Sequence, residues 1–64
     1  MTIGENIAQR RKAENLTQEQ LAEKVAVHQT MIAQIEMGRK VPGIYLATDI
    51  ARALHCTLDE LVSA

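Results

Sequence analysis

The sequence predicts an all-α protein made of five short helices, and three observations predict this fold class. The helix-start signature Ser/Thr-x-x-Glu/Gln occurs three times in 64 residues. Apolar residues recur at spacings of three and four, as they do on one face of a helix. Tyr45 is the single aromatic residue, so the core must consist of aliphatic residues and methionine. This composition suits packed helices better than a sheet.

Length and composition limit the possible functions. A chain of 64 residues is near the lower size at which a hydrophobic core stabilises a fold unaided, so we expect one domain over residues 1–64 without a large catalytic pocket. The single cysteine, Cys56, excludes an internal disulfide framework. No leader or long apolar run is evident. We therefore expect a cytoplasmic protein that needs no membrane, metal or cofactor.

Three helices are expected to begin with a capping box. In this motif the threonine hydroxyl accepts a hydrogen bond from a free backbone amide, and the acid or amide three residues later bonds back to the threonine amide. The three pairs are Thr2 with Glu5, Thr17 with Gln20, and Thr57 with Glu60.

The apolar pattern sets the helix limits. The first helix is expected over about residues 3–14, because Asn15 tolerates the left-handed conformation that ends helices. The second is short, about residues 18–25. The third is expected over about residues 29–37, with Met37 packed at its end and Gly38 as its stop.

The fourth helix is expected to begin near Ile44 and to end near His55, and the fifth to span about residues 58–62. The loop between Arg39 and Gly43 contains the only proline and is too short to divide two domains. An inward-facing stripe is expected on the fourth helix at Ile44, Ala47, Ile50, Ala51 and Leu54.

Residues 17–37 have the spacing of a helix-turn-helix, with a tight turn around residues 26–28. Val27 is expected to fill the angle between the two helices, because a fixed angle lets the second helix enter the major groove of DNA. The crossing is expected to be fixed by Leu21, Ala22, Val25, Ile32 and Ile35.

The outer face of the third helix suits DNA. At about 100° per residue, an inward Ile32 and Ile35 place Thr30 and Gln34 almost opposite. Gln29, near the exposed start of the helix, adds a second glutamine, and glutamine can bond to adenine N6 and N7 together. Contacts with a thymine methyl group are open to Thr30, Met31 and Ala33.

The charge distribution favours selective over indiscriminate binding of nucleic acid. The formal net charge is −1, whereas non-specific affinity comes mainly from neutralised phosphates. From Lys24 through Ile35 the chain has no Asp or Glu, and Arg39 and Lys40 follow. One surface is therefore expected to be locally positive.

The sequence resembles the phage-repressor and Cro-like helix-turn-helix proteins, the XRE family, across essentially the whole chain. Four segments carry the likeness in the family's order and spacing: IGENIAQRRK, LTQEQLAEKVAV, MIAQIEMGRKVP and IARALHCTLDEL. The resemblance implies a compact five-helix domain of the lambda-repressor type. It also implies a transcriptional regulator, expected to act as a repressor, that binds a near-palindromic DNA operator as a homodimer.

The resemblance also implies which residues contact DNA. The base-reading positions match Gln29, Thr30 and Gln34, with His28 and Met31 as accessory contacts. The positions near the DNA backbone match Gln18, His28, Arg39 and Lys40. Arg11 and Glu36 match a structural ion pair of the family, so we expect them to stabilise the fold and not to act in catalysis.

Two residues of the turn depart from the family pattern. Ala26 stands where glycine is usual, so either the turn differs or a left-handed alanine reduces stability by about 1–2 kcal/mol. His28 stands where serine or threonine usually caps the third helix. Two interpretations of His28 stay open, an exposed capping or turn residue and a contact to phosphate or base.

Other polar clusters have ordinary alternatives. His55 and Cys56 suggest a metal or a nucleophile, but zinc needs about four ligands and a catalytic cysteine needs an activating partner. We therefore expect a core cysteine beside a helix-end histidine. The run from Arg10 to Lys12 is either a phosphate patch or a solvated helix face.

Two rival functions use the same fold: an antitoxin whose main partner is a toxin, and an interaction module that no longer binds DNA. An enzyme is not expected, because no triad, Cys-His pair or paired carboxylates fall in a possible pocket. Several late apolar residues are either a dimer contact or ordinary exposed surface. They are Tyr45, Leu46, Leu58, Leu61 and Val62.

Overall fold

Five helices make up the fold in the computed structural model, which describes residues 2–63. Met1 and Ala64, the ends of the expected domain, lie outside the described residues. No strand occurs between residues 2 and 63. The prediction of five helices is confirmed, and each boundary lies within one residue of the expected one. The helices are α1 (Ile3–Ala13), α2 (Gln18–Lys24), α3 (Gln29–Glu36), α4 (Ile44–Ala53) and α5 (Leu58–Val62).

Capping boxes begin three of these helices, as predicted. The hydroxyls of Thr2, Thr17 and Thr57 accept hydrogen bonds of 3.0–3.1 Å from the backbone amides of the third helical residues. The reciprocal bonds to the threonine amides are all 2.8 Å. Among the described residues, α3 and α4 have no side-chain cap. Tertiary packing must therefore position these two helices.

Four helices are followed by a residue with left-handed backbone. Asn15 has a φ of 59° and Gly38 a φ of 77°, as expected from residues that tolerate this region. Ala26 (59°) and His55 (57°) adopt it as well. The turn before α3 thus keeps the helix-ending geometry despite alanine, and of the two alternatives the one with strain, about 1–2 kcal/mol, applies.

The core draws side chains from all five helices. The expected inward residues of α2, α3 and α4 are buried, with Ile44 as the exception. Ile44 is 62% exposed, because it is the first residue of α4 and its side chain leans toward the helix start, beyond the core. Met37 is 61% exposed, so its predicted packing is wrong; it ends α3 on the side away from Ile32 and Ile35. The largest fully buried side chains are Ile7, Leu21, Ile32, Ile35, Ile50 and Leu61.

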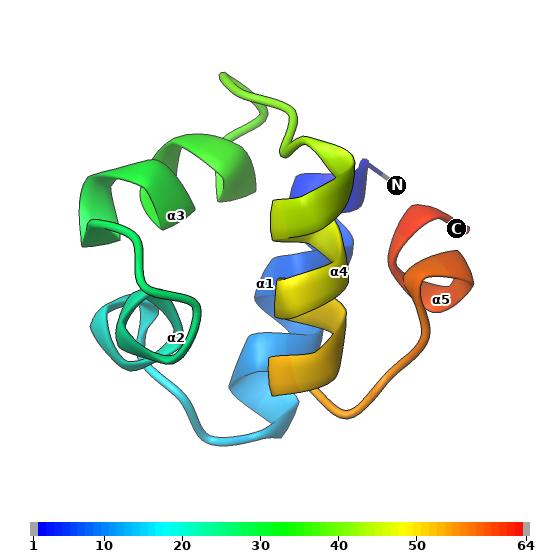
Figure 1. The fold of residues 1–64 in the computed structure, drawn as a ribbon, viewed down its shortest axis with the longest axis horizontal. Coiled ribbons are helices and arrows are strands. Elements are labelled where there is room, and N and C mark those ends of the chain that lie inside the picture. Colours follow the sequence, from blue (N-terminus) through cyan, green and yellow to red (C-terminus); the bar gives the residue numbers. More distant parts are fainter. Residues whose placement is uncertain (1, 64) are drawn as a thin grey trace.

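Helix α1 supports the helix-turn-helix and α5 from behind. In Figure 1, α2 and α3 lie on the left, α1 lies behind α4 in the centre, and α5 lies on the right. Gly4 lets α1 approach α3 closely, since a Cβ atom there would collide with the backbone carbonyl of Ile35. The buried Asn6 side chain donates to the carbonyls of Leu61 (2.8 Å) and Ser63 (3.0 Å). None of the helices within residues 2–63 has the length and apolar character needed to cross a lipid bilayer.

Candidate nucleic-acid interface

The turn between α2 and α3 is compact and partly buried. The Val27 amide donates to the Ala22 carbonyl at 3.0 Å, and the Ala26 amide to the Glu23 carbonyl at 3.3 Å. Val27 is half-buried and packs against the core, as predicted for the residue that fills the angle between the helices. The relative direction of α2 and α3 is therefore fixed by the turn and by the buried Leu21 and Ile32.

The expected base-reading residues lie along the side of α3 that faces away from the core. Ile32 and Ile35 are 0% and 1% exposed, which fixes the rotation of the helix. Gln29 and Thr30 are exposed, and Gln34 is half-buried. Thr30 and Gln34 line one hollow beside the turn, whereas Gln29 lies toward α2.

A buried ion pair joins α1 to the end of α3. The Arg11 guanidinium donates to both Glu36 carboxylate oxygens, Nε to Oε2 at 2.7 Å and Nη2 to Oε1 at 3.0 Å. The same side chain donates from Nη1 to the Leu16 carbonyl at 2.8 Å. Their side chains are only 10% and 6% exposed. This bidentate geometry is the strong form of an Arg–carboxylate contact, and it fixes the Glu36 carboxylate in place.

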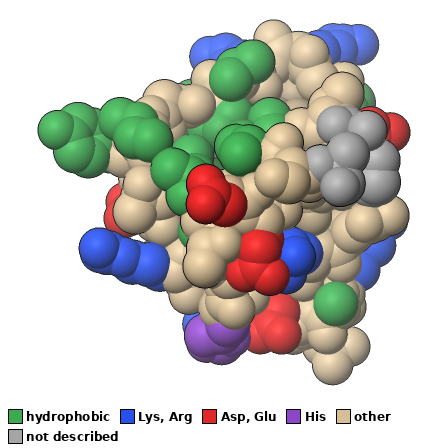
Figure 2. All heavy atoms as spheres, turned by 90° about the vertical axis from the view of Figure 1, so that its right-hand side faces the viewer, with side chains coloured by type: hydrophobic (Ala, Val, Ile, Leu, Met, Phe, Trp, Pro, Cys, Tyr) green, Lys and Arg blue, Asp and Glu red, His purple; other side chains and the backbone are tan. Residues whose placement is uncertain are grey.

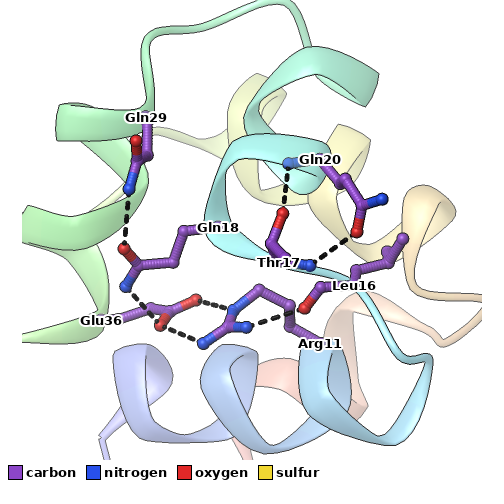
Figure 3. Close-up of polar contacts among 7 residues, drawn as sticks. All are labelled: Arg11, Leu16, Thr17, Gln18, Gln20, Gln29 and Glu36. Atoms are coloured by element: carbon purple, nitrogen blue, oxygen red, sulfur yellow. Dashed lines mark hydrogen bonds and ion pairs between the residues drawn. The ribbon is translucent and has the colours of Figure 1, made fainter.

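The Glu36 carboxylate continues the hydrogen-bond chain to the start of α3 (Figure 3). Gln18 Nε2 donates to Glu36 Oε1 at 3.0 Å, so the Gln18 amide oxygen points the other way. That oxygen accepts from Gln29 Nε2 at 3.4 Å. Sequence reasoning identified all four residues but missed the chain, which we call the Arg11–Gln29 network after its two ends. Its hydrogen bonds assign a donor side and an acceptor side to each glutamine.

The loop after α3 carries the two expected cations. The amides of Arg39 and Lys40 donate to the Gln34 carbonyl at 2.9 and 3.3 Å, which attaches the loop to the end of α3. Both residues are exposed. Within residues 2–63, neither side chain forms an ion pair. Their charges therefore remain available to an anion near the C-terminal end of α3.

His28 occupies the N-cap position of α3. Its backbone is extended (φ −73°, ψ 149°), as at an ordinary cap, but its side chain makes no capping bond within the described part of the chain. Capping by the imidazole ring is therefore not observed. His28 is an exposed turn residue at the start of α3, and a DNA contact stays a prediction.

The basic run on α1 does not form a single patch. Arg10 extends toward α5, where its Nη2 lies 3.5 Å from Glu60 Oε2. Arg11 points instead into the Arg11–Gln29 network. Only Lys12 of the three makes no ion pair within residues 2–63. The structure thus contradicts the alternative in which the three residues share a phosphate.

His55 and Cys56 show no arrangement for metal binding or nucleophilic chemistry. His55 Nδ1 lies 2.7 Å from Glu14 Oε1. Cys56 is half-buried against the core, and burial raises the pKa of its thiol, which disfavours the reactive thiolate. No group of three His, Cys, Asp or Glu side chains within the described residues is placed to hold a metal ion.

Comparison with known proteins agrees with this geometry. A helix-turn-helix family model matches residues 7–61. The chain is 40% identical over 63 residues to the transcriptional activator BcrR of Enterococcus faecalis, covering 98% of this chain and 31% of that protein. It is 38% identical over 61 residues to the cryptic phage CTXphi repressor RstR of Vibrio cholerae, covering 95% of this chain and 54% of that protein. The chain thus spans about a third to a half of these two relatives.

The fold is also that of a solved repressor. The crystal structure of the P22 c2 repressor in complex with a synthetic operator superposes with a TM-score of 0.93 at 30% identity. The match covers 98% of this chain and 96% of that one. The chain belongs to the phage-repressor and Cro-like, or XRE, family of helix-turn-helix proteins.

Proposed function

We propose that the protein binds double-stranded DNA in a sequence-specific manner through α3 and regulates transcription, as a repressor. The observation that carries this proposal is the outer face of α3. It presents Gln29, Thr30 and Gln34 without an acidic side chain among them, and the cations of Arg39 and Lys40 follow at its end. The relative from phage P22, which was solved on an operator, supports it.

Gln29, Thr30 and Gln34 read the bases in this proposal. Gln29 Nε2 uses one hydrogen on Gln18, which leaves its second hydrogen and its amide oxygen. This pair of groups matches the acceptor N7 and the donor N6 of adenine. The network therefore prepares Gln29 for adenine before DNA arrives.

The residues around α3 contact the DNA backbone. Gln18 is the first residue of α2, where the helix end favours a phosphate, and one Nε2 hydrogen remains after its bond to Glu36. His28, Arg39 and Lys40 contribute further phosphate contacts. These contacts position α3 in the groove but carry no sequence information of their own.

A homodimer on a near-palindromic operator completes the proposal. Hydrophobic side chains gather on the face of the molecule that Figure 2 shows. Tyr45 is 87% and Val62 is 56% exposed, whereas Leu61 is 0% exposed and belongs to the core. Tyr45 and Val62 are therefore the dimer candidates among the late apolar residues. Two copies would place their α3 helices in successive major grooves, about 34 Å apart.

The proposal treats residues 1–64 as one DNA-binding domain of a cytoplasmic regulator. It includes no catalytic step and no cofactor. A partner protein such as a toxin is the second candidate, because Val41 and Tyr45 are 82% and 87% exposed and apolar. In that case the protein would purify as a complex with its partner, and operator binding would be secondary.

Selection of bound sequences from a random duplex pool tests the proposal. The selected duplex should then be titrated at several salt concentrations. We expect an enriched near-palindrome and a linear fall of log K with log salt, with a slope of about −0.9 per phosphate neutralised. If no sequence is enriched at low salt, the DNA-binding proposal fails and the partner-binding candidate replaces it.

A further inference from the structure

A hollow lies beside α3, on the flank opposite the Arg11–Gln29 network. It has a volume of about 420 Å³. The turn contributes one wall and α3 contributes the other. The lining residues are Ala26, Val27 and His28 from the turn and Thr30, Met31 and Gln34 from α3.

The floor of the hollow is apolar and firmly held. Val27 and Met31 are half-buried, and both pack against the hydrophobic core. Thr30 and Gln34 add a hydroxyl, a methyl group and an amide. Within residues 2–63, the Gln34 amide has no hydrogen-bond partner, so its donor and acceptor remain available. The hollow thus combines a fixed apolar surface with an adaptable polar group.

The charges of the lining exclude a phosphate as the best occupant. None of the lining residues is Lys, Arg, Asp or Glu. The cations of Arg39 and Lys40 belong to the loop and do not line the hollow. An uncharged group with an apolar part next to hydrogen-bonding atoms fits this lining better than an anion does.

The edge of a base pair in the major groove offers one apolar group of this kind, the methyl at C5 of a pyrimidine. Thr30 and Gln34, which belong to the proposed reading face, share the hollow with Met31. We propose that this hollow receives a pyrimidine 5-methyl group of the operator, and that Met31 determines preference at that base. The inference rests on the proposed DNA-binding function and adds a residue to its specificity.

Uracil substitution in the selected duplex tests this inference. Each thymine of one half-site is replaced in turn by deoxyuridine, which removes only the methyl group. Affinity for the wild-type protein should fall about fourfold at one position, which corresponds to about 0.8 kcal/mol for one buried carbon group. In a second series, each cytosine is replaced by 5-methylcytosine, which distinguishes thymine from methylated cytosine as the source of the methyl.

Variants of Met31 connect the methyl group to the hollow. Met31→Gln keeps the length of the side chain but makes the floor polar, and the fourfold difference should shrink to nearly none. Thr30→Ser, which removes one methyl group from the hollow and leaves the core intact, should reduce the difference partly. Met37→Gln is the matched control, because Met37 is an exposed methionine of the same region outside the hollow. It should preserve the difference.

The outcomes separate this inference from the function on which it rests. A methyl effect that depends on Met31 or Thr30 but not on Met37 supports it, with either pyrimidine as the source. Specific binding in which no methyl effect responds to Met31→Gln or Thr30→Ser overturns the inference and leaves DNA binding in place. If no duplex is selected at all, the proposed function and this inference fail together.

Discussion

The two flanks of α3 are built differently, although both belong to the proposed reading face. On the flank toward α2, Gln29 is held by Gln18, which is held by Glu36 and Arg11. On the flank toward the turn, the Gln34 amide has no such support among the described residues and lies beside an apolar hollow. The first flank has a preset donor and acceptor pattern, whereas the second offers shape and an adaptable amide. We therefore expect mutations to affect the two flanks differently.

The largest effect is expected at the base of the network. Arg11→Met should lower the free energy of unfolding by about 3–5 kcal/mol, because the Glu36 carboxylate would stay buried without its partner. Urea denaturation measures this. Arg10→Met is the matched control: its ion pair with Glu60 is 39% and 50% exposed, so the loss should be below about 1 kcal/mol. Equal losses in the two variants would contradict a structural role for the network.

Gln34→Ala should weaken binding to the selected operator by about 1–3 kcal/mol and relax preference at one base, because a base contact is lost. Lys40→Ala should instead weaken binding to all sequences alike, since a phosphate contact is not specific. Gln9→Ala, an exposed glutamine on α1, serves as the control for the substitution itself. Equal losses on operator and scrambled DNA would remove Gln34 from the reading face.

Gln18→Ala tests whether the network sets the preference of Gln29. Loss of one hydrogen bond, worth about 1 kcal/mol, should reduce adenine preference at the Gln29 position although Gln29 itself is unchanged. Preference at the Gln34 position should persist. The measurement is competition between duplexes with single base changes. A uniform loss at both positions would show that Gln18 contributes a phosphate contact only.

The turn between the helices should tolerate glycine better than alanine. Ala26→Gly is expected to raise the free energy of unfolding by about 0.5–1 kcal/mol, because glycine removes the left-handed strain of about 1–2 kcal/mol but adds chain entropy. Ala13→Gly, at the helical end of α1, should lower it by a similar amount. Destabilisation by both substitutions would mean that Ala26 is not strained.

The smallest effect concerns acid. Hydrogen bonds from the backbone amide and then the hydroxyl of Thr2 hold the pKa of Glu5 below its usual 4.5, and Thr57 acts in the same way on Glu60. Because these values are lowered by folding, the stability they contribute is present above the unfolded pKa and is lost as pH falls through the folded one.

Glu60→Gln keeps the accepting oxygen of the capping box and removes its titration. The slope of stability against pH below about 4.5 should therefore be shallower in this variant than in the wild-type protein. Urea denaturation at several pH values provides the measurement. Unchanged slopes would show that this capping box does not contribute to acid sensitivity.

Much of the fold could be predicted because its signals are local. Threonine caps, Gly38 and the apolar spacing determine where helices begin and end, and they do so within short stretches of chain. Ile44 fitted the same spacing but is exposed, because spacing does not indicate where the core ends along a helix. Exposure at an end depends on which neighbouring helices reach that far.

The candidate site was predictable in its residues but not in their contacts. Gln18, Gln29 and Glu36 each occupied a family position, yet their hydrogen bonds depend on how α1, α2 and α3 cross. The hollow beside Met31 likewise arises from the packing of the turn against α3. Periodicity places a residue on a face, but it does not define the shape between two elements.

Parallel selections with the wild-type protein, Gln29→Ala and Gln34→Ala test the central claim most directly, that α3 reads DNA through these two flanks. We expect a near-palindrome for the wild-type protein, with preference lost at one symmetric pair of positions in each variant and at different pairs in the two. The same sequence preference in all three proteins, or none in any, would contradict the claim.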